Sequence, residues 1–418
     1  DKRDKTNTVT NPLKEINPTK DVTVKVGGDS IDGKSVYLNH TFLYRLDSSI
    51  LPPDRAYQTV TDWGGTDQLN TEYDQYLGNW AVYASRDLYR DGQMLAAKGE
   101  KIAGSGFDSS KFGGNLFTVD ADDNGKVTAD ATQAYLDLVS ADNEHEAGWV
   151  LYLQCKRIAV ADEVPNTWTE TINGQPRESN KVITKTPDMT PSIHLEKVDT
   201  PTLKQEGQEQ ADRDDSKQAL KMDADSIGIT FIITNTSKTD PATGDGAWYK
   251  ASDLNLDDST IVGDAHVDMD SLTYPDNWDT LVLKPGESVS VTGTLKGVKE
   301  GETHTDRAIV TGTPLVECAP SNGDPFNDES GDGIDPEYST GDVTEIDGKQ
   351  LCADTQTTSN TDDWNGYRSK PLASTGTAVL GLAGGALAVL LAGGSLLVFR
   401  KRHYAQGSGR HTAVNAGK

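Results

Sequence analysis

Basic side chains are scarce in this sequence of 418 residues, which has 39 Lys and Arg against 65 Asp and Glu and a formal net charge of −26. So acidic a chain lacks the basic surface that neutralises phosphates, which excludes nucleic acid as a partner. Three cysteines exclude a small disulfide-stapled scaffold. Seven histidines show no metal-ligand spacing, and we can place no nucleophile elbow, phosphate loop or glycosidase carboxylate pair. We therefore expect no cofactor and no enzymatic activity on an external substrate.

Glycine is abundant, with 40 residues, and it falls in turn signals between runs of alternating polarity. Val36 to Leu46 and Trp149 to Cys155 alternate with period two, as half-buried strands do. Asp91-Gly92 and Asn173-Gly174 are hairpin turn signals. Only Asp130 to Leu138 has a helical pattern. The sequence therefore predicts an all-β, immunoglobulin-like sandwich over residues 19–190 with one short inserted helix.

A second immunoglobulin-like sandwich is predicted over residues 191–314, beginning with the strand Ile193 to Val198. In it Lys197 and Asp306 are either an exposed pair or a lysine–acid crosslink. Residues 315–371 are dense in Asp, Gly, Thr and Ser, so we expect a disordered, acidic wall spacer there. Cys318 and Cys352 bracket this acidic stretch and are candidates for a disulfide, whereas Cys155 is expected to be a buried free thiol.

The only long uncharged run lies near the C-terminus. Gly376 to Phe399 contains no charged residue, and a helix of that length crosses about 30 Å of hydrocarbon. Residues 400–418 follow with five basic side chains and no acidic one. The positive-inside rule keeps such a tail in the cytoplasm. We therefore predict a transmembrane helix over 377–399 and place the acidic bulk of the chain outside the membrane.

The residues just before this run form a short motif: Leu372, Ala373, Ser374, Thr375 and Gly376. Together with the apolar run and the basic tail, the motif resembles the sorting signal of Gram-positive surface proteins in an alanine variant. The resemblance implies that a sortase attacks the Thr375 carbonyl, releases everything from Gly376 onward and attaches Thr375 to peptidoglycan. The protein would then be secreted, inserted in the membrane as a precursor and finally anchored in the cell wall.

Five short segments of the first domain resemble, in order and spacing, the last C-terminal domain of the streptococcal antigen I/II adhesins. They are Pro18 to Val24, Phe42 to Leu46, Asp74 to Asn79, Lys156 to Ala159 and Ser179 to Val182. The resemblance implies an immunoglobulin-like sandwich closed by an intramolecular Lys–Asn isopeptide bond. Carried over residue by residue, it implies Lys20 and Asn180 as the crosslinked pair and Asp67 as the catalytic acid, with Asp62 as the fallback.

A calcium loop is the weakest of the candidate sites. Asp120, Asp122 and Asn124, followed by Gly125, have the spacing with which such a loop begins. The bidentate Glu that position twelve requires is Ala131 here, so we predict a plain turn in preference to a metal site.

Residues 1–18 are interpreted as the last strand of a missing upstream domain, because the sequence at 7–12 is similar to that at 180–187. The function predicted for the chain is the C-terminal stalk or adherence region of a wall-anchored surface adhesin, whose ligand the sequence does not identify. The alternative is the anchoring region of a wall-bound enzyme whose catalytic domain lies upstream.

Overall fold

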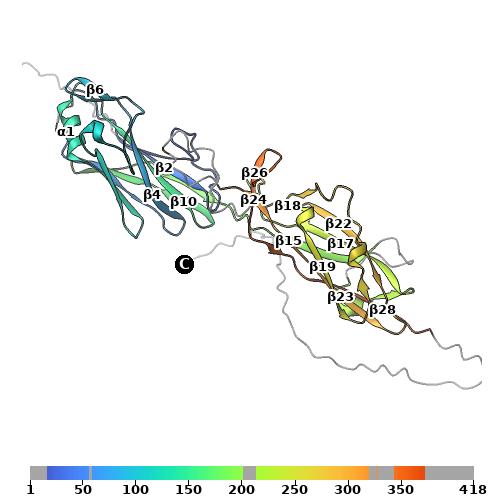
Figure 1. Cartoon of the computed structure of the whole chain (residues 1–418). Helices are drawn as coiled ribbons and strands as arrows, with labels where there is room; N and C mark the ends of the chain where they lie inside the picture. Colours follow the sequence, from blue (N-terminus) through green and yellow to red (C-terminus); the bar gives the residue numbers. More distant parts are fainter. Residues whose placement is uncertain (1–16, 56–58, 201–212, 320–325, 327–342, 372–418) are drawn as a thin grey trace, which may run out of the picture. The chain divides into compact units, whose positions relative to one another are not determined.

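The computed structural model describes residues 17–55, 59–200, 213–319, 326 and 343–371. Strands dominate these residues and form two β-sandwiches, the first within residues 19–186 and the second within 193–368 (Figure 1). The prediction of tandem all-β domains is confirmed. The predicted sortase motif (372–376), membrane helix (377–399) and basic tail (400–418) lie outside the described residues, as do residues 1–16. Among the residues described, no helix combines the length and the apolar character that a membrane crossing requires.

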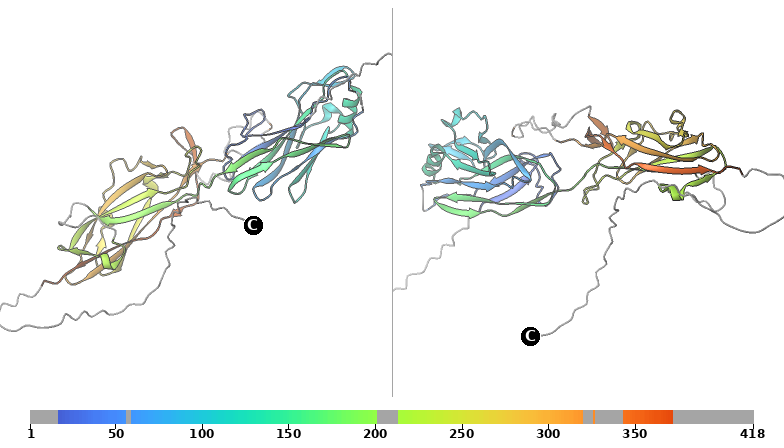
Figure 2. Two further views of the ribbon diagram at one scale, coloured as in Figure 1. Left: turned by 180° about the vertical axis from the view of Figure 1, so that it is seen from behind. Right: turned by 90° about the horizontal axis from the view of Figure 1, so that it is seen from below.

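Two five-stranded antiparallel sheets make the first sandwich (Figures 1 and 2). One sheet has the order β1 (Thr19–Thr23), β2 (Thr41–Asp47), β10 (Trp149–Arg157), β4 (Asp74–Ala84), β7 (Lys101–Gly104). The other has the order β13 (Gln175–Glu178), β12 (Trp168–Ile172), β3 (Trp63–Gln68), β9 (Lys126–Ala131), β8 (Phe117–Ala121). Two short pairs complete it, β11 (Ala161–Asn166) with β14 (Val182–Thr186) and β5 (Leu88–Arg90) with β6 (Gln93–Ala96).

Aromatic side chains from both sheets fill the space between them. Trp63, Trp149 and Trp168 are each at most 1% exposed, and neighbouring rings lie about 6 Å apart in tilted arrangements. Such rings bury more apolar surface than any other side chain and carry much of the stabilisation of a sandwich core. The turn signals are confirmed, because Asp91-Gly92 and Asn173-Gly174 close the β5–β6 and β12–β13 hairpins with positive φ at both residues.

The inserted helix is present but lies three residues later than predicted. α1 spans Gln133–Ala141, whereas Asp130 and Ala131 still belong to strand β9. The helix buries Tyr135, Leu136 and two further apolar residues against the sandwich. Its start is displaced because residues 126–131 pair with β3 and β8, and this tertiary pairing overrides the local helical pattern.

The second sandwich pairs a four-stranded sheet with a larger one. The first sheet has the order β15 (Ile193–Asp199), β17 (Ser226–Asn235), β22 (Ser288–Lys296), β20 (His266–Val267). The second has the order β16 (Leu220–Met222), β28 (Asp362–Arg368), β23 (Thr303–Gly312), β19 (Asn255–Val262), with β27 (Thr357–Thr358) beside β23. Smaller sheets join β18 (Tyr249–Lys250) to β21 (Val282–Leu283), and β24 (Leu315–Glu317) to β26 (Lys349–Ala353) and β25 (Thr344–Ile346).

The prediction of a disordered spacer over 315–371 is wrong for the residues described there. β28 lies inside the sheet between β16 and β23, and Trp364 is fully buried in the core of the second sandwich. The second domain therefore extends well beyond the predicted end at residue 314. The polar composition is misleading because Asp362 and Asn365 are themselves buried and hydrogen-bonded, to the Lys197 N–H and the Arg213 carbonyl respectively.

Candidate crosslinking sites

Lys20 lies in the first sandwich with its side chain completely buried. It occupies β1 opposite Leu46 of β2, and its Nζ lies 4.4 Å from the centroid of the Tyr44 ring. Complete burial lowers the pKa of the Lys20 ammonium, and the adjacent Asp67 carboxylate opposes part of that shift. A lysine with a lowered pKa supplies neutral amine more readily, which is the form that attacks a carbonyl carbon.

Asp67 is the residue that the structure brings to this amine. Its Oδ2 accepts a hydrogen bond from Lys20 Nζ, while its buried Oδ1 has no hydrogen-bond partner. The fallback, Asp62, lies before the other end of β3, where its carboxylate accepts from the Gly174 N–H at 3.0 Å. The geometry therefore selects Asp67 as the acid beside Lys20.

A second buried carboxyl group lies on the far side of Tyr44. The Tyr44 hydroxyl donates to Asp74 at 2.7 Å, and Arg157 Nε lies 2.9 Å from the other Asp74 oxygen. Burial raises the pKa of Asp74, and the positive charge of Arg157 opposes that shift. In this core Lys20 and Arg157 thus lie beside Asp67 and Asp74. Asp74 and Arg157 were not expected at a site, although both lie within the antigen I/II-like segments.

Asn180 contacts Lys20 through the main chain. Its Oδ1 accepts from the Lys20 N–H at 2.8 Å and its Nδ2 donates to the Lys20 carbonyl at 2.9 Å. The residue itself is exposed, whereas the Lys20 side chain points into the core. The structure therefore brings Asn180 to the strand that carries Lys20, with its amide group engaged by that strand's backbone.

Asn166 is a different kind of asparagine. It is 6% exposed, and neither its Oδ1 nor its Nδ2 has a hydrogen-bond partner. An amide buried without partners is costly and calls for an explanation. Asn166 precedes Trp168 by two residues, and Trp168 both pairs with Asp67 and donates from Nε1 to the Thr19 carbonyl at 3.0 Å. The amide of Asn166 thus belongs to the same end of the core as Lys20 and Asp67.

Sequence reasoning missed Asn166, although a signal was present. Val164, Asn166 and Trp168 follow one another with period two and are all buried. That alternation would have placed an asparagine on the inward face of the sandwich.

The pair Lys197 and Asp306 in the second sandwich is also brought together. Lys197 Nζ lies 2.6 Å from Asp306 Oδ1, and both side chains are completely buried. The alternative of an exposed pair is therefore wrong.

The cysteines occupy two environments. Cys318 and Cys352 form a disulfide with 5.0 Å between their Cα atoms. Cys155 is a buried free thiol on β10, and its burial raises the pKa well above the ordinary value, which keeps it a neutral apolar side chain.

The residues of the weak calcium candidate form a turn. Asp122 Oδ1 accepts hydrogen bonds from the Asn124 and Lys126 N–H groups, both at 2.9 Å, between β8 and β9. Within the part of the chain that the structure describes, His, Cys, Asp and Glu form no group of three that could hold a metal ion.

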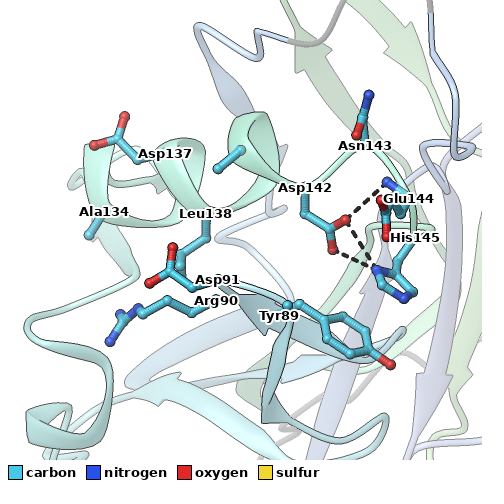
Figure 3. Close-up of a pocket in the computed structure, with 12 residues that line it drawn as sticks. Tyr89, Arg90, Asp91, Ala134, Asp137, Leu138, Asp142, Asn143, Glu144 and His145 are labelled. Carbon is cyan, nitrogen blue, oxygen red and sulfur yellow. Dashed lines mark hydrogen bonds and ion pairs between the residues drawn. The ribbon is translucent and has the colours of Figure 1, made fainter.

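An open pocket of about 490 Å³ lies between helix α1 and the β5–β6 hairpin (Figure 3). The His145 ring stacks on Tyr89 with 3.8 Å between centroids, and its Nδ1 lies 3.0 Å from an Asp142 carboxylate oxygen. The His145 ring is thus already engaged by Tyr89 and Asp142, and we assign the pocket no ligand.

Comparison with known proteins finds a family match over the region of the first sandwich. Residues 17–187 match the family described as "Cell surface antigen C-terminus". The resemblance predicted from the sequence is confirmed for this region. The match ends before the second sandwich begins.

One curated relative is an aggregation substance of Enterococcus faecalis, 35% identical over 189 residues. The alignment covers 44% of this chain and 14% of that protein, so this chain spans only a small part of its relative's length. Among solved structures, the C-terminal domain of the antigen I/II-family protein AspA of Streptococcus pyogenes is 29% identical over 42% of this chain and 48% of that chain, with a TM-score of 0.36. The C-terminal domain of Streptococcus agalactiae BspA is 23% identical over 41% of this chain and 50% of that chain, also with a TM-score of 0.36.

Proposed function

We propose that this chain is the C-terminal stalk of a cell-wall-anchored surface adhesin of a Gram-positive bacterium. The similarity of residues 17–187 to the C-terminal region of cell surface antigens supports a place on the cell surface. The relative that is an aggregation substance supports a role in adhesion. The observation that carries the proposal is the buried Lys20–Asp67 pair, because an amine in contact with a carboxyl group in a dry core can form an intramolecular amide bond.

The crosslink is an amide between Lys20 Nζ and the side-chain carbonyl carbon of an asparagine. The neutral amine attacks that carbon, a C–N bond forms, and the amide nitrogen leaves as ammonia. Asp67, hydrogen-bonded to Nζ, takes a proton from the amine and passes it to the leaving nitrogen. No external reactant is required.

We propose that Asn166 supplies the side-chain carbonyl carbon of the crosslink, in place of the Asn180 expected from the resemblance. Burial without hydrogen-bond partners favours Asn166, since a bond to Lys20 would relieve an unsatisfied amide. The two main-chain hydrogen bonds of Asn180 favour a structural role for that residue instead.

Intact mass tests the crosslink in the full chain. We expect the Lys20 bond to remove about 17 Da, the mass of ammonia, and digestion to locate this loss in a branched peptide that joins Lys20 to Asn166. Asp67→Asn and Asn166→Ala should each abolish this branch, whereas Asn180→Ala should retain it. Linear Lys20 peptides from folded wild-type protein would rule the bond out, and a branch at Asn180 would return the acyl role to that residue.

Anchoring completes the proposal. A sortase cleaves between Thr375 and Gly376 and joins Thr375 to an amine of peptidoglycan, after segment 377–399 has held the precursor in the membrane. The order of motif, uncharged run and basic tail supports this step. Thr375→Ala should leave the protein in the membrane fraction. Unchanged release from the wall by a peptidoglycan hydrolase would contradict the anchoring step.

A further inference from the structure

The second sandwich contains its own completely buried lysine. Lys197 lies in the middle of β15, opposite Phe231 of β17, and its Nζ lies 5.5 Å from the centroid of the Phe231 ring. The side chain has no exposed surface. An amine in such a position needs a compensating charge or a covalent partner, because burial of an unpaired ammonium is strongly unfavourable.

Two carboxyl groups flank this amine. Asp306 Oδ1 lies 2.6 Å from Lys197 Nζ, and Asp258 Oδ2 accepts a hydrogen bond from the same nitrogen. Both acids are at most 1% exposed. They lie on neighbouring strands of the larger sheet, since Thr260 of β19 pairs with Asp306 of β23. The cluster therefore holds an amine nucleophile in contact with two carboxyl groups in a dry site.

Lys197, Asp258 and Asp306 together carry one net negative charge when all three are ionised. Burial, reinforced by the charge of Asp306, raises the pKa of Asp258 to about 6, although Lys197 opposes the shift. His304 Nε2 lies 3.3 Å from Asp306 Oδ2, and both side chains are buried. Asp258 is thus the group best suited to hold and release a proton.

The hydrogen bonds around the two lysines show which strands correspond in the two sandwiches. Ser179 Oγ accepts from the Trp168 N–H at 3.1 Å, and Ser359 Oγ accepts from the Val310 N–H at 3.0 Å. The asparagine that follows each serine bonds to the main chain of the first strand: Asn180 to Lys20, and Asn360 to Leu195. Strand β15 therefore corresponds to β1, and β23 corresponds to β12.

This correspondence assigns the roles of the two acids. In the first sandwich Asp67 lies on β3, the strand beside β12. In the second, Asp258 lies on β19, the strand beside β23, and so takes the place of Asp67. Asn166, at the end of β11, precedes Trp168 by two residues, whereas Asp306 of β23 precedes Val310 by four. Lys197 likewise lies two residues beyond Leu195, the residue that Asn360 bonds, so the lysine and its acyl candidate are displaced by the same two residues in the second sandwich.

We propose that Lys197 condenses with Asp306 to form a second intramolecular amide bond, with Asp258 as the proton carrier. Asp258 first passes its proton to Asp306, to which it is hydrogen-bonded. The neutral Nζ then attacks Cγ of the resulting carboxylic acid, a C–N bond forms, and one C–O bond breaks. Asp258 accepts a proton from the attacking nitrogen and delivers it to the departing hydroxyl, which leaves as water. Atoms and charges balance without any further reactant, and the product joins β15 of one sheet to β23 of the other.

Peptide mapping of the full chain tests this bond. The folded protein is purified, its fold is checked by circular dichroism, and it is then reduced, denatured and digested for mass spectrometry. We expect one branched peptide that joins Lys197 to Asp306, about 18 Da lighter than the two linear peptides together because water has left. Linear Lys197 peptides would overturn the proposal, and a branch at Asp258 would overturn the assignment of roles.

Two matched variants test the separate roles of Asp306 and Asp258. Asp306→Asn replaces the acid by an amide of the same shape, so the same bond would form with loss of ammonia and give a branched peptide of the same mass as in the wild type. Asp258→Asn keeps the shape but removes the proton carrier and should yield only linear peptides. A linear Asp306→Asn protein, or a branched Asp258→Asn protein, would contradict the mechanism. The Lys20 peptides are separate from the Lys197 peptides in the same digest, so each of the two proposed crosslinks is tested independently of the other.

Discussion

The two sandwiches bury a lysine on the corresponding strand but surround it with different charges. In the first, Lys20 and Arg157 face Asp67 and Asp74, and the acyl candidate Asn166 is uncharged. In the second, Lys197 faces Asp258 and Asp306, His304 lies beside Asp306, and the acyl candidate is one of these acids. An amide electrophile leaves the charges of a core balanced, whereas a carboxyl electrophile adds an anion that burial must neutralise by protonation. The comparison shows how one scaffold can support loss of ammonia in one domain and loss of water in the next.

Truncation after residue 314 has the largest expected effect on stability, and this effect differs between the two domains. It removes β28 and the fully buried Trp364 from the second sandwich and none of the strands of the first. We expect the second domain to lose its cooperative unfolding transition, while the first retains its own, as measured by differential scanning calorimetry. The milder variant Trp364→Ala should cost about 3–5 kcal/mol of unfolding free energy. A second sandwich that still unfolds cooperatively without residues 315–371 would contradict this prediction.

Loss of the first crosslink comes next. Asp67→Asn should prevent the bond and free the unfolded chain from a loop of about 146 residues, which lowers the unfolding free energy by about 5 kcal/mol. The measurement is the midpoint of chemical denaturation of the first sandwich. Asp62→Asn is the matched control, because Asp62 holds a hairpin turn away from Lys20 and should leave the midpoint nearly unchanged. Equal midpoints for wild type and Asp67→Asn would contradict the stabilising role of the bond.

The excess of acids in the second sandwich predicts a specific pH dependence. Burial raises the pKa of Asp362 to about 7, with neighbouring carboxylates adding to the shift and the Lys197 N–H opposing it. The folded state therefore holds this proton more tightly than the unfolded chain does. The resulting stabilisation is fully present below about pH 4 and is lost as the pH rises through 7; we expect about 4 kcal/mol over that range.

Asp362→Asn should flatten the pH dependence of the second sandwich, measured by denaturant titration at several pH values. Since Asp362 lies on β28 outside the first sandwich, the first domain of the same variant serves as the internal control. An unchanged slope in the variant would assign the pH dependence to other groups.

Replacement of Asn180 or Asn360 has the smallest expected effect on stability. These two asparagines make the most similar contacts in the two domains. Replacement of either by Ala removes two hydrogen bonds to the main chain of the first strand. We expect each to cost about 1–2 kcal/mol of unfolding free energy, with no loss of a branched peptide in either domain. A much larger cost for Asn180→Ala, together with the loss of the Lys20 branch, would show that the two asparagines are not equivalent.

Local patterns predicted most of the first sandwich. Period-two runs and glycine turns located its strands, and residue-by-residue resemblance located Lys20 and Asp67, which the structure places in contact. The choice of Asn180 depended on its place in a resembling segment. Sequence spacing cannot distinguish an amide that is bonded to the main chain from one that is buried without hydrogen-bond partners. Only burial and hydrogen-bond partners separate Asn180 from Asn166.

The end of the second sandwich could not be predicted from composition. β28 reads Asp-Asp-Trp-Asn-Gly-Tyr-Arg, in which only Trp364 and Tyr367 favour a strand, whereas its Asp, Asn and Gly residues disfavour one. It is held in the sheet by its neighbours, since β23 pairs along it on one side and β16 on the other. Such tertiary pairing depends on residues far away in the sequence, which is why a local interpretation predicted a spacer.

Asn180 and Asn360, which hydrogen-bond to the main chain of the first strands, also cover part of the outer edges of the sheets. β1 and β15 are each the last strand in their sheet, so their outward N–H and C=O groups could pair with a strand from another molecule. Asn180 occupies the donor and acceptor of Lys20, and Asn360 occupies those of Leu195. A strand from another molecule that added to either edge at these residues would first have to displace both hydrogen bonds of the asparagine there.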